Sequence, residues 1–181
     1  VVAQTSSMVG MLAAGNLFAG QFVGLVGTSG GIVNFGRPWT SRPTAMRIWC
    51  KYETGLINIL NNNNLGVSKN DYDRAQIKFA IGTWEYRKYG GSKESPVKVN
   101  TTDESTFVDF RKDPGTIANG DLIIHNDGYI LNGAEKVNAS TWEWAEYTIP
   151  LNYHTIDQKP THIIISCAAS QYGDYFTGCS S

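Results

Sequence analysis

The sequence has little charge, and the charge that it has is almost balanced in sign. Charged residues make up 17% of the 181 positions, with 15 basic and 16 acidic side chains. A typical globular protein carries about 25%, and nucleic-acid binding needs a basic excess that is absent here. Intrinsic disorder combines high charge with few aromatic residues, whereas aromatic residues reach 12%. We therefore expect a folded chain with no nucleic-acid partner.

Cysteine and histidine are also scarce. The three cysteines, Cys50, Cys167 and Cys179, are an odd number at wide spacing, which does not indicate a disulfide framework. No Cys-x-x-Cys, His-x-His or His-Glu-x-x-His spacing occurs, so the sequence indicates no metal site. We expect buried free thiols, with a Cys167–Cys179 disulfide as the alternative.

The first 36 residues contain no charged side chain at all. The segment Met8–Gly27 has the length of a membrane-spanning helix. It nevertheless contains Asn16, Gln21 and five glycines, and it has no basic flank. It also lacks the positively charged start of a signal peptide. We expect two buried strands joined by glycine-rich turns, with a membrane span as the alternative.

Alternation of apolar and polar residues is the main structural signal. It is found in Thr44–Tyr52, Gln76–Trp84 and Glu143–Tyr153, and a β-branched run follows in His162–Cys167. Turn sequences such as Asp113-Pro114-Gly115 separate these segments, and only Asn132–Val137 looks helical. Short strands between such turns are typical of a sandwich. The prediction is one all-β domain over residues 1–181, a two-sheet antiparallel jelly-roll sandwich.

Within these strands the expected core side is defined by alternate residues. It comprises Met46, Ile48, Cys50, Tyr52, Ile77, Phe79, Ile81, Ala145, Tyr147, Ile149 and Leu151. The opposite side of the first strand carries Arg47, Trp49 and Lys51 and is expected to face solvent.

No motif marks a catalytic centre. There is no Gly-x-Ser-x-Gly nucleophile elbow and no phosphate-binding loop. A glycoside hydrolase usually needs two carboxylates at a fixed separation. Asp71 and Asp73 are expected to be solvated in a loop, while Glu143 and Glu146 fall on opposite faces of a strand. No residue is therefore predicted to be catalytic.

The aromatic residues are more informative about function. A sugar ring presents a face of C–H bonds that packs on an aromatic ring, while neighbouring polar side chains bond its hydroxyl groups. Exposed Trp or Tyr beside such side chains is thus typical of a glycan-binding site. The predicted glycan contacts are Trp49, Trp84, Tyr86 and Trp142, with Arg47 and Lys51 as hydrogen-bond donors.

The sequence as a whole resembles one known family. The resemblance rests on the segments Ala14–Gly20, Phe35–Trp39 with Arg42-Pro43, Lys51-Tyr52, Ile81–Trp84, Pro96–Thr101, Ile149–Tyr153, Lys159–Ile163 and Tyr172–Gly178. They occur in the family's order and cover nearly the whole chain. The family is called "putative carbohydrate metabolism domain" and is found in surface lipoproteins of glycan-degrading Gram-negative bacteria.

The resemblance implies a jelly-roll fold similar to that of carbohydrate-binding modules, with residues 8–27 in strands. It implies an exported protein at the outer-membrane surface or in the periplasm, lipid-anchored through a part not present here, and no transmembrane span in this chain. It supplies no catalytic residue and no cofactor, although jelly-roll binding modules often hold a structural calcium. Family members begin earlier and continue into a further strand with an Asp-Asp pair. The chain is thus expected to be a core fragment with an open sheet edge for a strand-donating segment or subunit.

Three functions follow as hypotheses. The first is a non-catalytic domain that binds or presents a polysaccharide in an exported surface protein. The second is a glycoside hydrolase, with Asp109, Asp121 and Asp174 as its first candidate carboxylates. The third is a structural or adhesive module that accepts a strand at its open edge.

Overall fold

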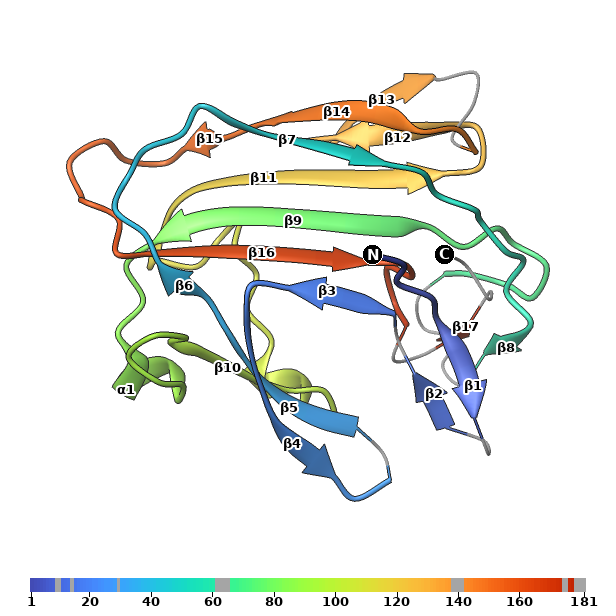
Figure 1. The fold of residues 1–181 in the computed structure, drawn as a ribbon, viewed down its shortest axis with the longest axis horizontal. Helices are drawn as coiled ribbons and strands as arrows, with labels where there is room; N and C mark the ends of the chain where they lie inside the picture. Colours follow the sequence, from blue (N-terminus) through green and yellow to red (C-terminus); the bar gives the residue numbers. More distant parts are fainter. Residues whose placement is uncertain are drawn as a thin grey trace.

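The chain forms a layered antiparallel β-structure (Figure 1). The computed structural model describes residues 1–8, 11–13, 15–28, 30–60, 66–137, 142–173 and 176–177. A large sheet crosses the middle of the molecule, the β7–β14 pair lies along one side of it and a three-stranded sheet lies on the other. The predicted all-β sandwich is confirmed.

The central sheet has the strand order β13-β12-β11-β9-β16-β3, with β15 added to β11 and β6 added to β16. Its strands are β3 (Asn16–Phe18), β6 (Arg37–Pro38), β9 (Ala75–Gly82), β11 (Thr116–His125), β12 (Gly128–Leu131), β13 (Ala134–Val137), β15 (Asn152–Tyr153) and β16 (His162–Ala168). All neighbouring strands in it run antiparallel.

The remaining elements form smaller units. The three-stranded sheet contains β4 (Gly20–Val26), β5 (Gly30–Phe35) and β10 (Val97–Asn100), and β7 (Ala45–Cys50) pairs with β14 (Ala145–Pro150). Two further pairs join β1 (Ser6–Met8) to β2 (Met11–Ala13) and β8 (Ile59–Leu60) to β17 (Phe176–Thr177). One helical turn, α1 (Tyr86–Tyr89), and a 3-10 turn (Glu104–Thr106) complete the described elements.

The main apolar core lies between the central sheet and the β7–β14 pair. Ile77 and Leu122 of the central sheet meet Tyr147 and Ile149 of β14, and Tyr52 closes the same cluster. These are alternate residues of their strands, which is why one face of each strand is apolar. The predicted inward residues of these segments are confirmed as core or as its partly buried border.

The opposite face of the central sheet is apolar only at one end. There Ala80 and Ile164 of the central sheet pack with Val97 of β10 and with Trp84. Farther along this face the side chains are mostly polar, and the central sheet and the three-stranded sheet leave a cleft between them. This change from apolar to polar along one sheet face creates the candidate site.

The segment Asn132–Val137 is not helical, which corrects the prediction. Asn132 and Gly133 have positive φ values of 49° and 85°, and they connect β12 to β13 as a two-residue hairpin turn. Asn-Gly is the sequence that favours this turn, because both residues tolerate the left-handed region. The turn chemistry overrides the helical tendency of Ala134-Glu135-Lys136.

Where it is described, the charge-free N-terminal segment forms strands, as expected, but β4 is largely exposed and β5 only partly buried. Phe22, Val23 and Leu25 of β4 are more than half exposed. Within the described residues, no helix is long and apolar enough to cross a membrane.

The cysteines of the described residues form no disulfide. Cys50 and Cys167 are free thiols and are partly buried at the main core, while Cys179 lies outside the described residues. Burial raises the pKa of Cys50 to about 11, and the neighbouring Cys167 adds to the shift.

The prediction that Asp73 is solvated is wrong, because the residue is fully buried. Its carboxylate accepts from the Arg74 amide and the Ser170 hydroxyl.

Candidate functional site

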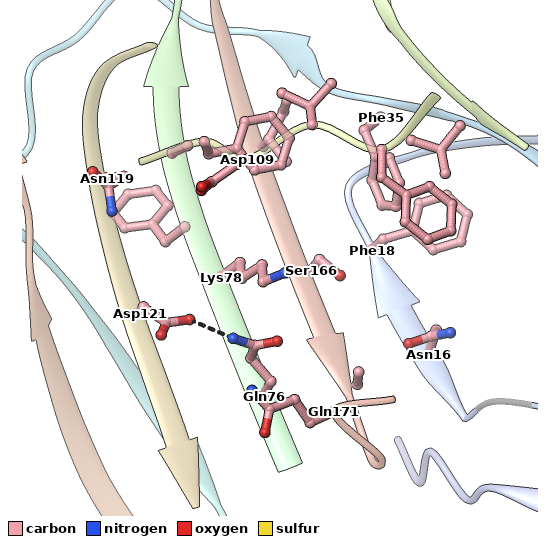
Figure 2. A pocket seen from close by; sticks show the side chains of 18 of the residues that line it. Asn16, Phe18, Phe35, Gln76, Lys78, Asp109, Asn119, Asp121, Ser166 and Gln171 are labelled. Atoms are coloured by element: carbon pink, nitrogen blue, oxygen red, sulfur yellow. Dashed lines mark hydrogen bonds between the residues drawn. The ribbon is translucent and has the colours of Figure 1, made fainter. Parts of the chain in front are cut away.

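A cleft of about 800 Å³ opens on the face of the central sheet that points away from the main core. Its floor is formed by β9, β11 and β16, and its sides by β3, β5, β10 and the segment that follows the 3-10 turn (Figure 2). Ligand sites for small molecules usually measure about 300–1,000 Å³. The cleft is therefore large enough for a small molecule or a few sugar units.

A polar row crosses the floor of the cleft. In the strand register, Lys78 of β9 lies directly opposite Asp121 of β11 on one side and opposite Ser166 of β16 on the other. All three line the cleft. Side chains at directly opposed positions lie about 5 Å apart at their Cβ atoms. The sheet itself thus places a carboxylate, an ammonium group and a hydroxyl side by side.

Asp121 is held from two sides. Its Oδ1 accepts from Nε2 of Gln76 at 3.0 Å, and its Oδ2 accepts from the guanidinium of Arg111 at 2.6 Å. The Asp121 side chain is 5% exposed, while that of Arg111 is 58% exposed. Charge-assisted hydrogen bonds of this kind fix the carboxylate in place before any ligand arrives. The side chains of Gln76 and Asp121 meet on the floor in Figure 2.

Lys78 is open to the cleft, yet the surrounding protein desolvates its ammonium group. This desolvation lowers the pKa of Lys78 below its ordinary value, although the charge of Asp121 opposes the shift. Arg111 lowers the same pKa further and Asp109 raises it. The ammonium is therefore in an environment that solvates it less well than water does.

A second hollow of about 260 Å³ continues past β11. It shares Arg111, Asn119 and Asp121 with the large cleft and adds Asn132, Asn152 and His154, among others. Asn119 is ordered here, because its Oδ1 lies 2.7 Å from Nε2 of His154. The shared residues make the two hollows one elongated surface, which suits a chain-like ligand.

The sides of the cleft include aromatic rings. Phe18 and Phe35 meet edge to face with centroids 5.2 Å apart, and Phe107 and Phe110 line another part. Phe107 is 41% exposed. The cleft therefore combines polar groups on its floor with apolar ring surface on its sides.

The predicted contacts Arg47 and Trp49 lie elsewhere, on the exposed side of β7, and the exposed Lys51 follows the end of this strand. Trp49 is 62% exposed, and its indole donates to Oε2 of Glu146 on the paired strand at 3.0 Å. Arg47 also reaches Glu146, at 3.9 Å. The expected outward orientation of this strand face is confirmed.

Trp142 and Trp144 are exposed by 46% and 67% in the segment that leads into β14. We call Trp49, Trp142 and Trp144 the outer tryptophans. They do not line the cleft.

The expected exposure of Trp84, a predicted glycan contact just after the end of β9, is wrong. It is 2% exposed, packs edge to face on Phe110 and donates its indole N–H to Oδ1 of Asp113 at 3.0 Å. Asp113 also accepts from the hydroxyl of Tyr89. Burial, with the hydrogen bond and charge of Asp113, raises the pKa of Tyr89 to about 12. Trp84 has no free ring face for a sugar.

Tyr86 is half-buried at the start of α1, and Arg87 lies over its ring at 5.5 Å. Figure 1 shows α1 far from the end of β7 that carries Trp49. The predicted contacts are thus not brought together into one site.

The structure does unite two of the candidate carboxylates. Asp109 and Asp121 both line the cleft, whereas Asp174 lies outside the described residues. Sequence reasoning missed Gln76, Lys78, Arg111 and Ser166. The alternation of β9 could have placed Gln76 and Lys78 on one face, but nothing in the sequence shows that Arg111 folds over that face.

Among the described residues, no group of three or more His, Cys, Asp or Glu side chains is arranged to hold a metal ion. The structural calcium considered from the family resemblance therefore stays an untested expectation.

The chain resembles known proteins in sequence and in fold. The sequence profile of the family described as "Putative carbohydrate metabolism domain" matches residues 2–181. The chain belongs to this family. It is thus a carbohydrate-metabolism-related domain, and the predicted family is confirmed. No protein of curated function matches the chain.

Two solved structures share the fold. One is described as a "putative glycoside hydrolase" from Bacteroides thetaiotaomicron, with a TM-score of 0.53 at 20% identity, covering 93% of this chain and 44% of that one. The other, given the same description, is from Bacteroides vulgatus, with a TM-score of 0.54 at 18% identity, covering 93% and 61%. The chain therefore spans about half the length of these neighbours, and at such identity the likeness concerns the fold alone.

Proposed function

We propose that this chain is a non-catalytic domain that binds a glycan in the cleft, as part of an exported cell-surface protein that takes up or presents polysaccharide. The observation that carries the proposal is the preformed polar floor of the cleft. Gln76, Asp121 and Arg111 are fixed by mutual hydrogen bonds, and aromatic rings stand at the sides. Sugars need this combination of oriented polar groups and apolar surface.

The family supports a carbohydrate ligand, and the elongated shape formed by the two hollows supports a chain of several sugar units. The outer tryptophans are a second candidate for glycan contact, because their rings are exposed and Trp49 lies between Arg47 and Lys51 at alternate positions along the chain. Trp49 and the cleft lie on different faces of the sandwich, so a substitution on each face tests the two candidate surfaces separately.

We expect Ser166→Tyr to weaken oligosaccharide binding by roughly tenfold or more, which is about 1.4 kcal/mol. The added ring fills the floor beside Lys78. Trp49→Ala serves as the matched surface variant and is expected to leave the dissociation constant unchanged within about twofold. The measurement is calorimetric titration with the best oligosaccharide from a glycan array, run on proteins with equal thermal stability.

The reverse result would move the site to the outer face. In that case Trp49→Ala weakens binding by about 1–3 kcal/mol, as stacked aromatic contacts do, and Ser166→Tyr has no effect. Such an outcome would restore the site predicted from the sequence.

A glycoside hydrolase is favoured by one observation, the presence of Glu104, Asp109 and Asp121 around the same cleft. Against it, both oxygens of Asp121 accept hydrogen bonds from Gln76 and Arg111, which suits a role in ordering the binding site and not in catalysis. Release of reducing sugar from any polysaccharide, lost in Asp109→Asn, would establish the enzyme in place of the binding domain.

An adhesive module is favoured by the exposed apolar side chains of β4, which is an edge strand of the described three-stranded sheet. Such an edge can accept a further strand from another segment or subunit. This function predicts stable assembly with a protein partner and no affinity for sugars.

A further inference from the structure

In the part of the chain that is described, some charged side chains around the cleft have a bonded partner of opposite charge, and Lys78 does not. Arg111 is bonded to Asp121, and Asp109 lies 3.7 Å from the exposed ammonium of Lys112. Within the described part of the chain, no ion pair or hydrogen bond engages the Nζ of Lys78. Glu104 is the remaining acidic residue around the cleft, and it is exposed at the side rather than on the floor.

Asp121 is the direct cross-strand neighbour of Lys78, but its carboxylate is bonded to Gln76 and Arg111 and not to Lys78. Gln76 and Arg111 occupy both oxygens of Asp121, so this carboxylate is oriented by them. On the other side Lys78 has only Ser166, a hydroxyl, at the opposed position of β16. Figure 2 shows the Lys78 nitrogen extending toward Ser166 across the open floor.

Lys78 is exposed to the cleft and its ammonium has no bonded counter-ion among the described residues, so this interaction is incomplete. A ligand anion placed between Lys78 and Ser166 would complete it, since Lys offers three donors and no acceptor. A neutral hydroxyl would satisfy the donors but would not compensate the charge. The floor is therefore better matched to a ligand that brings a negative group to this point.

We propose that the cleft selects an acidic glycan and that Lys78, with Ser166 beside it, binds the carboxylate or sulfate group of one sugar unit. This inference rests on the proposed function and specifies its substrate class. Lys78 acts as a specificity-determining residue, while the Asp121–Arg111–Gln76 group contacts the neutral hydroxyls of the same chain.

The test uses affinity electrophoresis with polygalacturonate for carboxylate, dextran sulfate for sulfate, and dextran and galactan as neutral polymers. We expect the whole chain to bind one of the acidic polymers more tightly than either neutral one. Lys78→Met should weaken that binding by roughly tenfold or more, because a charge-assisted contact is lost, and Lys78→Arg should keep most of it. The control is Lys112→Met, which removes one surface charge outside the cleft and should change little.

The outcomes distinguish the proposed selection of an acidic glycan from the proposed binding of glycans in the cleft. Binding of neutral polymers through the cleft, lost in Ser166→Tyr but untouched in Lys78→Met, would overturn the inference and leave the proposed function standing. Equal losses in Lys78→Met and Lys112→Met would also overturn it, because they would show general charge attraction. Failure of every polymer to bind folded protein would overturn both.

Discussion

Trp84→Ala is expected to destabilise the fold by about 3–5 kcal/mol, the usual cost of removing a buried aromatic side chain. The side chain is 2% exposed, and it joins Ala80, Val97 and Ile164 in the cluster that closes one end of the space between the two sheets. Its removal leaves a cavity there and deprives Asp113 of the indole donor. Urea denaturation followed by far-ultraviolet circular dichroism measures the loss.

Two further variants make this result specific. Trp84→Phe keeps most of the ring but loses the hydrogen bond, so a smaller cost of about 1–3 kcal/mol is expected. Trp49→Ala, on the exposed side of β7, should stay within about 0.5 kcal/mol of the parent protein. A cost of Trp84→Ala no larger than that of Trp49→Ala would contradict the buried position.

Asp121→Ala should cause one of the largest losses of glycan affinity, about 10- to 100-fold, or about 1.4–2.7 kcal/mol. Without the carboxylate, Gln76 and Arg111 lose the acceptor that orients both of them. The charge that raises the pKa of Lys78 also disappears, so this pKa should fall further. Calorimetric titration gives the affinity, and nuclear magnetic resonance of the lysine side chains gives the pKa.

Asp109→Ala is the matched variant, because Asp109 also borders the cleft but has an exposed side chain whose ion pair with Lys112 is loose. We expect an affinity change below about threefold, as is usual for exposed ion pairs. Equal effects of the two substitutions would show that the cleft responds to net charge and not to the ordered Asp121 group.

The alternation of β7, β9 and β14 was sufficient to predict the sandwich and its main core, because a half-buried strand must place every second side chain inward. The hairpin at Asn132-Gly133 could also have been read from its turn sequence. Trp84 was misplaced because it follows the end of β9, where strand alternation no longer determines the direction of a side chain. Asp73 was misplaced for a similar reason, since a loop position does not reveal what packs over it.

The site was harder to predict than the fold. Its floor comes from three strands that are far apart in the sequence, and its Arg111 comes from a connecting segment. Only the strand register shows that Lys78, Asp121 and Ser166 form one row. The sequence therefore pointed to Trp49 and Trp142, whose exposure could be inferred locally, and overlooked polar residues whose meaning depends on long-range pairing.

The most direct test of the central claim is a nuclear magnetic resonance titration of the labelled protein with the oligosaccharide that it binds best. We expect the largest shifts at the backbone amides of Lys78, Asp121 and Ser166, with the indole signals of Trp49 and Trp142 unchanged. Shifts confined to those indoles, or no shifts with any glycan, would contradict binding in the cleft.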